Sequence, residues 1–566
     1  MFVRKHRTIA DTKSPWIALL LILYLPLPVY AEQREVERVH LYGTYTINQT
    51  NVSEFDNRFH FEEIQLEAEI ISPNGTRFIQ LGYFDGLSKD TLQPQWKVKF
   101  TPHSAGEWRY RTSWSDGSRG SSGRFQVLRE TRNGLHGLVL VDPNNLRALT
   151  HSDGTPHYWW GGKWISAMDY GPETKLGKLN ANFSQKLGVV VGHKTNQHLI
   201  DYLDILEREK HNGLLLKIAM FPLENDGISW DLDWIRRAEW LVEEAAARGI
   251  YVQINFFDTW SRDRSKVFQN TTDAKKHVLN AWNPDSWFSS EIPQIKNYVK
   301  TIVARFSGYS NVYWELGNEM EHTNCGPCFA EMANAYYLPW IRDFDPYKRP
   351  IGLSEDIWKE TTADIGFLHQ ANELPHPDLD RPVIMNELVR GGIDKALWRD
   401  DAMRDPKSRI AFRRAYWQNF VLGGVGASQA TWLDISQPLN EAAFNVMYDQ
   451  KQHRKLVERF VKNINDTYHL ASIVRSSSSW VGTRGSHTEG IYLTYLLGKP
   501  EQTIESNTLL LQPPAGAYRL SWFDPISGTE LKAATEIKIE DSIPAQIMHP
   551  TFREDLVLII NRLPDP

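Results

Sequence analysis

The stretch that decides the fold runs from Ile295 to Glu319 and reads IKNYVKTIVARFSGYSNVYWELGNE. Its first half predicts a helix with one apolar face, because apolar residues recur there at helical spacing. These residues are Ile295, Val299, Ile302 and Phe306. Ser307-Gly308 ends the helix, and the apolar run from Val312 to Leu316 predicts a buried strand. A helix followed at once by a buried strand is the repeating unit of a parallel α/β fold.

The same unit recurs along the middle of the chain. Before it, a helical stripe at Trp234, Ala238, Leu241 and Ala245 is ended by Gly249 and followed by an apolar strand. Eight strands are predicted in all, at residues 158–161, 214–220, 250–254, 312–316, 351–354, 365–369, 383–385 and 427–432. Eight strands alternating with helices favour an α/β (β/α)8 TIM barrel over residues 133–474. A doubly wound open sheet is the competing topology, but no glycine-rich phosphate loop accompanies any of these strands.

Both flanks of the barrel are predicted to be β-rich domains. Residues 32–132 alternate apolar and polar side chains with period two, as in Trp96-Lys97-Val98-Lys99-Phe100, and predict an N-terminal Ig-like β-sandwich of antiparallel strands. No carboxylate pair or ligand cluster stands out in that segment. The serine-rich stretch 475–479 is interpreted as a linker, and residues 475–566 as a C-terminal β-sandwich domain. A chain of 566 residues is long enough for several such units.

Composition narrows the class of partner. Apolar residues make up 41% and charged residues 23% of the chain, which is typical of a globular protein. The formal net charge of −6 is small for this length, so no polybasic surface indicates nucleic acid or an anionic membrane as a partner. The 21 Trp residues fit either core packing or stacking on the apolar faces of sugars.

The first 31 residues have the pattern of a signal peptide. A basic region that includes Arg4 and Lys5 precedes the apolar run from Trp16 to Leu25, and Val29-Tyr30-Ala31 fits a cleavage site. An uncleaved membrane anchor is the alternative, but Pro26 and Pro28 interrupt a run that would need about 20 apolar residues to span a bilayer. The sequence therefore predicts export to the periplasm or the extracellular space, with no stable membrane span in the mature protein.

Cys325 and Cys328 are the two cysteines of the chain, and they lie in the tetrapeptide Cys-Gly-Pro-Cys. A redox site would need this motif to follow a strand and open a helix in a small βαβ domain. A metal site would need two further ligands. In an oxidising compartment we expect the pair to close a short loop as a disulfide.

Acidic residues at strand ends carry the most weight, because active sites of parallel barrels lie at the carboxyl ends of the strands. The fourth and seventh predicted strands both end in Asn-Glu, at Glu319 and Glu387. Two carboxyl groups across a barrel mouth can hydrolyse a glycosidic bond, one protonating the leaving oxygen and the other attacking or activating water. The alternative is that one or both form ordinary ion pairs at the rim. Glu315 lies about 13 Å deeper on the same strand face, and Glu355, which ends the fifth strand, is the reserve second carboxylate.

Five further residues are predicted to reach the barrel mouth. Trp164 and Trp432, on the first and eighth strands, are candidate sugar platforms or packed core. His369 ends the sixth strand and is expected either to hydrogen-bond the substrate or the nucleophile, or to be a rim histidine. Asp258 ends the third strand and is a candidate hydroxyl ligand, although solvation or a helix cap is the favoured interpretation. Lys163 is a candidate contact for an acidic sugar, or a rim lysine paired with a neighbouring acid.

The motif Trp314-Glu315-Leu316-Gly317-Asn318-Glu319, with Glu387 ending a later strand, resembles the retaining glycoside hydrolases whose acid/base and nucleophile lie on strands four and seven. The resemblance implies that Glu319 is the acid/base, Glu387 the nucleophile, and Asn318 a donor to the hydroxyl next to the reacting carbon.

The wider chain resembles the apiosidase-like group, in which a sandwich, this barrel and a C-terminal domain labelled collagen-binding follow one another. The stretches 154–160 and 516–525 carry that likeness. Where such barrels often have Gly-Asp-Thr after the first strand, this chain has Gly162-Lys163-Trp164, so the resemblance does not transfer a substrate.

These observations predict an exported retaining glycosidase that cleaves O-glycosidic bonds of a complex plant or algal carbohydrate without a metal or organic cofactor. A non-catalytic glycan- or matrix-binding surface protein is the alternative from another class. A polysaccharide lyase is the rival among enzymes.

Overall fold

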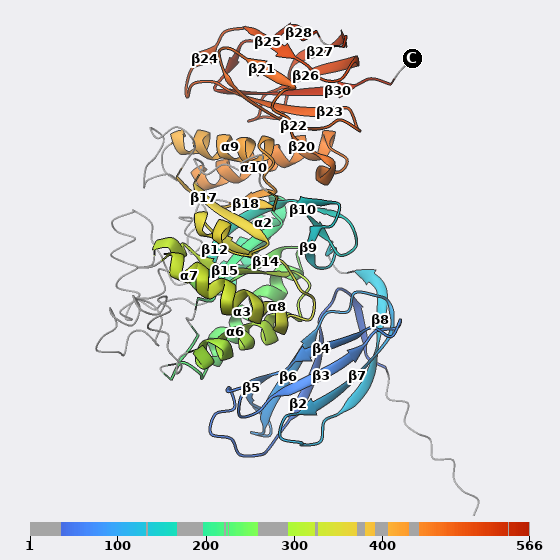
Figure 1. Cartoon of the computed structure of the whole chain (residues 1–566), viewed down its shortest axis with the longest axis vertical. Helices are drawn as coiled ribbons and strands as arrows, with labels where there is room; N and C mark the ends of the chain where they lie inside the picture. Colours follow the sequence, from blue (N-terminus) through green and yellow to red (C-terminus); the bar gives the residue numbers. More distant parts are fainter. Residues whose placement is uncertain are drawn as a thin grey trace, which may run out of the picture.

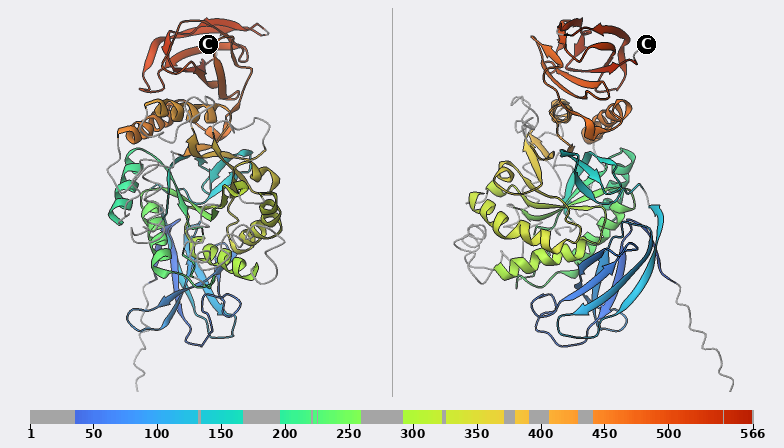
Figure 2. Two further views of the ribbon diagram at one scale, coloured as in Figure 1. Left: turned by 90° about the vertical axis from the view of Figure 1, so that its left-hand side faces the viewer. Right: turned by 45° about the vertical axis from the view of Figure 1, so that its right-hand side comes forward.

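The computed structural model describes residues 36–131, 134–166, 196–219, 222–224, 226–258, 292–322, 326–370, 380–390, 406–428, 441–541 and 543–564. The molecule is elongated, with three units stacked along its longest axis (Figure 1). The N-terminal β-domain lies at one end, the barrel in the middle, and the C-terminal β-domain beyond helices α9 (Pro406–Val421) and α10 (Glu441–Phe460) at the other end. The two views of Figure 2 show the same order.

The central unit is a closed barrel of eight strands, in the order β12-β13-β14-β15-β16-β17-β18-β19. Every neighbouring pair in this ring is parallel. The strands are β12 (Trp159–Ser166), β13 (Gly213–Lys217), β14 (Tyr251–Asp258), β15 (Val312–Asn318), β16 (Ile351–Ser354), β17 (Ile365–Gln370), β18 (Val383–Arg390) and β19 (Gly426–Ser428). All eight overlap the predicted strands, so the predicted TIM barrel is confirmed.

Helices cover the outside of the barrel. The described α-helices are α2 (Asn196–Arg208), α3 (Leu232–Ala246), α6 (Ile292–Phe306), α7 (Gly326–Met332), α8 (Leu338–Phe344), α9 (Pro406–Val421) and α10 (Glu441–Phe460). The N-cap of α3 is Asp231, whose carboxylate accepts a hydrogen bond from the backbone N–H of Trp234. Gly249 has a φ of 68°, which lets the chain leave α3 and enter β14 within a few residues.

The N-terminal domain consists of two packed sheets, as predicted. Their strand orders are β1-β8-β7-β3-β4 and β2-β6-β5. The strands are β1 (Arg38–Leu41), β2 (Tyr45–Thr50), β3 (Leu66–Ile71), β4 (Arg77–Leu81), β5 (Tyr83–Leu87), β6 (Pro94–Phe100), β7 (Gly106–Trp114) and β8 (Ser122–Thr131). One pairing differs from the antiparallel expectation, since β1 runs parallel to β8.

A small antiparallel sheet joins the sandwich to the barrel. It comprises β9 (Val139–Asp142), β10 (Asn145–His151) and β11 (Pro156–His157), in the order β11-β10-β9. Its last strand ends two residues before β12, so it leads the chain directly into the barrel.

The C-terminal domain has a sheet of order β20-β22-β23-β30-β26-β27, a second of order β21-β25-β28, and the pair β24-β29. Its strands are β20 (Tyr468–His469), β21 (Val474–Ser476), β22 (Trp480–Ser486), β23 (Ile491–Leu497), β24 (Thr503–Ile504), β25 (Thr508–Leu511), β26 (Gly516–Phe523), β27 (Glu530–Ile539), β28 (Ala545–Met548), β29 (Phe552–Arg553) and β30 (Asp555–Arg562). The linker interpretation of residues 475–479 is wrong, because Val474 to Ser476 pair with β25. The serine hydroxyls form a turn instead, in which Ser476 Oγ accepts from the backbone N–H of Ser478 and Ser479.

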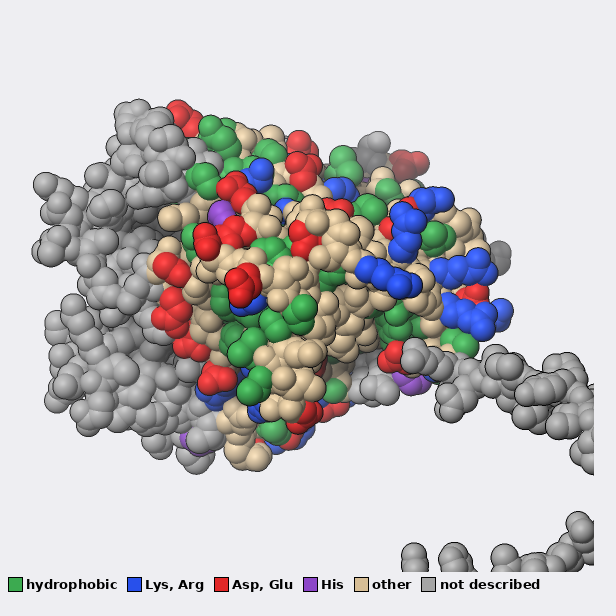
Figure 3. Space-filling view, turned by 90° about the horizontal axis from the view of Figure 1, so that it is seen from below, with side chains coloured by type: hydrophobic (Ala, Val, Ile, Leu, Met, Phe, Trp, Pro, Cys, Tyr) green, Lys and Arg blue, Asp and Glu red, His purple; other side chains and the backbone are tan. Residues whose placement is uncertain are grey.

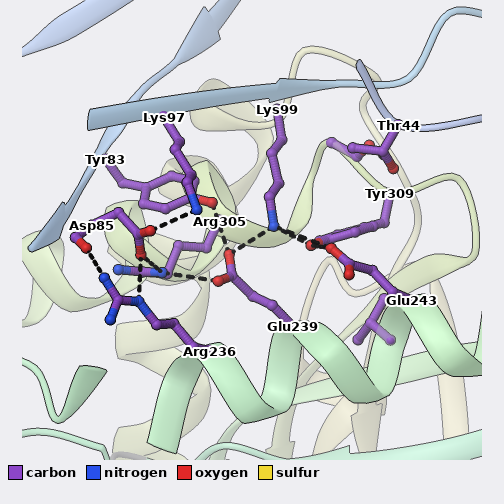
Figure 4. Close-up of polar contacts among 12 residues, drawn as sticks. Thr44, Tyr83, Asp85, Lys97, Lys99, Arg236, Glu239, Glu243, Arg305 and Tyr309 are labelled. Atoms are coloured by element: carbon purple, nitrogen blue, oxygen red, sulfur yellow. Dashed lines mark hydrogen bonds and ion pairs between the residues drawn. The ribbon is translucent and has the colours of Figure 1, made fainter. Parts of the chain in front are cut away.

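A buried network of charged side chains joins the sandwich to the barrel helices (Figure 4). Glu239 of α3 accepts hydrogen bonds from Tyr83 at 2.8 Å and from Lys99 at 3.2 Å, both on the sandwich. Arg305 of α6 contacts Glu239 at 3.1 Å and Asp85 of β5 at 3.4 Å. Burial raises the pKa of Tyr83, so its hydroxyl stays a proton donor to Glu239. The sequence did not single out these residues, because they meet only in the folded chain.

The C-terminal domain is joined to the barrel in a similar way. Arg413 of α9 is buried and donates to Asp555 at 2.8 and 3.0 Å and to Glu554 at 2.9 Å. The neighbouring Asp555 carboxylate outweighs the cost of burial and raises the pKa of Arg413, which keeps the guanidinium charged. Both β-domains therefore contact barrel helices through buried ion pairs.

Seen from the sandwich end, Lys and Arg side chains and Asp and Glu side chains lie on different parts of the same face (Figure 3). Neither sign covers this face, in agreement with the small net charge. Among the described residues, no helix has the length and apolar character needed to cross a membrane. The predicted signal peptide, residues 1–31, lies outside the described residues.

Candidate active site

Glu319 directly follows β15, at the carboxyl end of the fourth barrel strand. Its backbone has a φ of 54°, a conformation that non-glycine residues adopt uncommonly. Ser354, the last residue of β16, accepts a hydrogen bond from the Glu319 backbone N–H at 2.7 Å and donates one to Gly317 at 2.9 Å. The neighbouring strand thus holds the backbone turn that carries Glu319, and the Glu319 side chain keeps 16% of its surface exposed.

Asn318 lies beside Glu319 in a fixed orientation. Its side-chain amide donates to Asp258 at 2.8 Å, and Asp258 lies 3.5 Å from Lys217. All three side chains are buried. The favoured interpretation of Asp258 as a solvated residue or helix cap is therefore wrong: it ends β14 inside the barrel and contacts Asn318 and Lys217.

His369 brings two carboxyl groups together. Its Nδ1 lies 3.3 Å from Glu319 Oε1 and 3.5 Å from Glu355 Oε1. Glu355 follows β16 with a φ of 56°, and its backbone N–H donates to Phe367 of β17 at 2.7 Å. Neither interpretation of His369 named this contact with the predicted acid/base, and a hydrogen bond from His369 to the substrate or the nucleophile stays a prediction.

Glu315 lies deeper in the barrel, as its position on the strand indicated. It is fully buried, and Asn386 of β18 donates to it at 3.4 Å. Burial raises the pKa of Glu315 to about 7, while the charges of Lys217 and His369 act in the opposite direction. Glu315 is predicted to be a charge in the barrel core that needs a partner, and Asn386, Lys217 and His369 supply such partners.

The remaining predicted residues are described in part or not at all. Glu387 lies in β18 next to Asn386, and Lys163 and Trp164 lie in β12, where Trp164 pairs with Leu215 of β13. Trp432 lies outside the described residues, and β19 ends at Ser428. Cys325 also lies outside them, while Cys328 is part of α7. The disulfide stays a prediction.

Three of these residues offer the donor set for a metal ion. One ligand atom each of Glu319, Glu355 and His369 lies within 4.8 Å of the others. Three protein ligands are the number found in catalytic zinc sites. The same spacing fits a histidine that hydrogen-bonds two carboxylates, with His369 Nδ1 at 3.3 Å from Glu319 and 3.5 Å from Glu355.

Sequence reasoning missed two residues of this site, Lys217 and Ser354. Both end barrel strands, β13 and β16. The rule that selected Glu319 from its strand terminus would have selected Ser354, which also ends the predicted strand 351–354, had it been applied to residues other than acids. It would not have selected Lys217, which lies inside the predicted strand 214–220 and ends the strand only in the structure.

Comparisons with known proteins agree with this architecture. A family model described as cellulase (glycosyl hydrolase family 5) matches residues 198–385, and a domain of unknown function, DUF5060, matches residues 38–115. No curated protein sequence matches the chain.

Solved structures share the fold at low identity. A candidate glycoside hydrolase from Bacteroides vulgatus ATCC 8482 is 15% identical with a TM-score of 0.65. The match covers 93% of this chain and 100% of that one. A glycoside hydrolase family 5 structure from the same organism is 12% identical with a TM-score of 0.52, over 76% of this chain and 94% of that one. A third structure, described as a glycoside hydrolase, is 12% identical with a TM-score of 0.52, over 77% of this chain and 100% of that one.

The closed parallel barrel and the acidic residues at its strand ends thus occur together with a family 5 match. Together with the fold shared with solved glycoside hydrolases, these observations support the conclusion that the protein is a glycosidase, an enzyme that hydrolyses glycosidic bonds. A carbohydrate substrate follows from that class.

Proposed function

We propose that the chain is an exported retaining glycoside hydrolase that cleaves O-glycosidic bonds in a complex plant or algal polysaccharide or oligosaccharide. Glu319 protonates the leaving oxygen, and Glu387 attacks the anomeric carbon to form a glycosyl-enzyme. Glu319 then takes a proton from water, which releases the sugar with its original configuration. The observation that carries the proposal is the position of Asn318-Glu319 and Asn386-Glu387 at β15 and β18 of one closed barrel.

The surroundings of Glu319 suit a general acid. It keeps access to solvent and therefore to a substrate, whereas its neighbours Asn318 and His369 are buried and held by other side chains. We assign to Asn318, whose amide donates to Asp258 at 2.8 Å, the contact with the sugar hydroxyl next to the reacting carbon. Fixed groups of this kind lose little freedom when substrate binds.

The direct test is substitution of Gln for each carboxylate, with Glu331→Gln as the control. Glu331 is exposed on α7, so its variant carries the same chemical change away from the strand ends. On a panel of plant and algal polysaccharides, we expect Glu319→Gln and Glu387→Gln to lose at least about a hundredfold in kcat/KM, and Glu331→Gln to match the wild type. Near-normal turnover by either variant would remove that residue from the mechanism.

The stereochemistry of the first product tests retention separately. Proton NMR of an early time point shows whether the released sugar keeps its anomeric configuration. An inverted product would contradict a glycosyl-enzyme on Glu387. Glycan binding without new reducing ends would favour the non-catalytic binder, and an unsaturated product that absorbs ultraviolet light would favour a lyase.

A further inference from the structure

One ring nitrogen of His369 faces two carboxyl groups at nearly equal distance. The contacts are 3.3 Å to Glu319 and 3.5 Å to Glu355, and they come from the ends of two different strands. Ionised carboxylates only accept hydrogen bonds, so Nδ1 must carry the hydrogen for either contact to be favourable. A single N–H forms a strong hydrogen bond with one acceptor at a time, because hydrogen bonds weaken steeply as the N–H···O angle departs from linearity.

Glu355 is fixed in place but has no part in the two-carboxylate mechanism. Its side chain is 8% exposed, and its backbone N–H is tied to Phe367. Its φ of 56° is the uncommon conformation also seen at Glu319. Strained backbone of this kind is concentrated at functional sites. A buried carboxylate so close to the candidate acid must change the electrostatics of that acid.

We propose that Glu355 is a positioning residue. Its carboxylate alternates with that of Glu319 as the acceptor of the hydrogen bond from His369 Nδ1–H during the catalytic cycle. This role rests on the proposed function of Glu319 as acid/base. While Glu319 is protonated, the His369 N–H bonds to Glu355. When Glu319 has given its proton to the leaving oxygen, its carboxylate accepts the N–H. When Glu319 takes a proton from water, the N–H returns to Glu355. His369 keeps its proton throughout.

The sharing has an electrostatic consequence. The oxygen of Glu355 lies within 4.8 Å of that of Glu319, so its negative charge opposes ionisation of Glu319 and keeps the acid protonated to higher pH. Other charged groups of the described residues near the strand ends include Glu315 of β15, Lys217 of β13 and Asp258 of β14. Glu321, two residues after Glu319, has buried carboxylate oxygens, and Asp356, next to Glu355, pairs with Lys359. Burial raises the pKa of Glu315, and the charges of Lys217, which lies 3.5 Å from Asp258, and of His369 oppose that rise. Glu355 and Glu319 both contact Nδ1 of His369.

The first test is the pH dependence of Glu355→Gln, with Glu360→Gln as a matched control. Glu360 lies at the end of the same short helix, Asp356–Glu360, and is exposed. In Glu355→Gln we expect the alkaline limb of kcat/KM to move to lower pH by about one unit, and kcat to fall about tenfold. We expect KM to stay within about twofold. A profile equal to that of Glu360→Gln would overturn the proposal.

A second measurement is independent of turnover. In full-length protein carrying 15N-labelled histidine, the His369 Nδ1 signal is assigned by its loss in His369→Gln. We expect this signal to change in Glu355→Gln and not in Glu360→Gln. No change in Glu355→Gln would overturn the shared proton even if the protein hydrolyses glycans.

Two further outcomes separate the alternatives. If Glu355→Gln changes the His369 signal but the wild type hydrolyses no glycan, the proposed function is refuted, and with it the positioning role of Glu355 in catalysis, while the contact between Glu355 and His369 stands. A signal that changes on dialysis against a chelator would show that Glu319, Glu355 and His369 hold a cation, which would also overturn the shared proton.

Discussion

Ser354 Oγ accepts a hydrogen bond from the Glu319 backbone N–H at 2.7 Å and donates one to Gly317 at 2.9 Å. One hydroxyl on β16 therefore bridges two residues on either side of the end of β15. Without it, the backbone at Glu319 would lose a support for its φ of 54°. The position of the candidate acid depends on a residue of a neighbouring strand.

We expect Ser354→Ala to cause a large loss of activity and only a small loss of stability. We expect a loss of about 1 kcal/mol in the free energy of unfolding, because one buried hydroxyl is removed. We expect kcat/KM to fall about a hundredfold, since a small displacement of a catalytic group is costly. Ser527→Ala, in a surface turn of the C-terminal domain, is the control and should change neither. Steady-state kinetics and urea denaturation measure the two effects, and equal activity in the two variants would contradict this role.

Glu315 should make the stability of the protein depend on pH. Burial raises its pKa from 4.5 to about 7, so the folded chain binds a proton more tightly there than the unfolded chain. Stability from this group is then fully present below pH 4.5 and falls as pH rises towards 7. The loss is about 3 kcal/mol above that range. Glu315→Gln should remove this slope, which chemical denaturation at pH 5 and pH 8 would detect. An equal slope in wild type and variant would argue against it.

Glu239→Gln should destabilise the contact between sandwich and barrel. The substitution removes the carboxylate that Lys99 and Arg305 contact, so two buried cations lose their shared partner. We expect a cost of about 3 kcal/mol in the free energy of unfolding. Glu243→Gln on the same helix is the control, because its side chain is 56% exposed and should cost less than about 1 kcal/mol. Limited proteolysis should cut Glu239→Gln between the two domains sooner than the control.

In the proposed exported form of the protein, Cys325 and Cys328 should be joined by a disulfide. Mass spectrometry without reductant should find a peptide that contains Cys325 and Cys328 with the mass of a disulfide, and thiol titration of the unfolded chain should find no free thiol. The bridge closes a loop of four residues, for which the chain-entropy relation gives about 2 kcal/mol of stabilisation. Two free thiols after export would refute the prediction.

The barrel was predictable because its signal is local. Each strand is a short apolar run after a helical stripe, and a strand terminus such as Asn318-Glu319 can be identified without knowing its neighbours. Contacts between distant segments carry no such signal. Helices α7 and α8 lie between Glu319 and Ser354 in the sequence, and Lys99 and Glu239 belong to different domains. The interpretation of the serine-rich stretch 475–479 as a linker is wrong for a related reason, because Val474 pairs with Leu511, which lies on a later strand.

The attachments of the two β-domains have a consequence for how such a chain can evolve. Glu239 on α3 contacts Lys99 of the sandwich and Arg305 on α6 contacts Asp85, and α6 leads into the strand that ends at Asn318. The C-terminal domain is held by Arg413 on α9, the described helix that follows the strand of Glu387. Gene recombination that exchanged either domain would remove partners of these buried charges: Lys99 and Asp85 of the sandwich, and Asp555 of the C-terminal domain. We therefore expect a replaced β-domain to require matching changes on the barrel helices that it contacts.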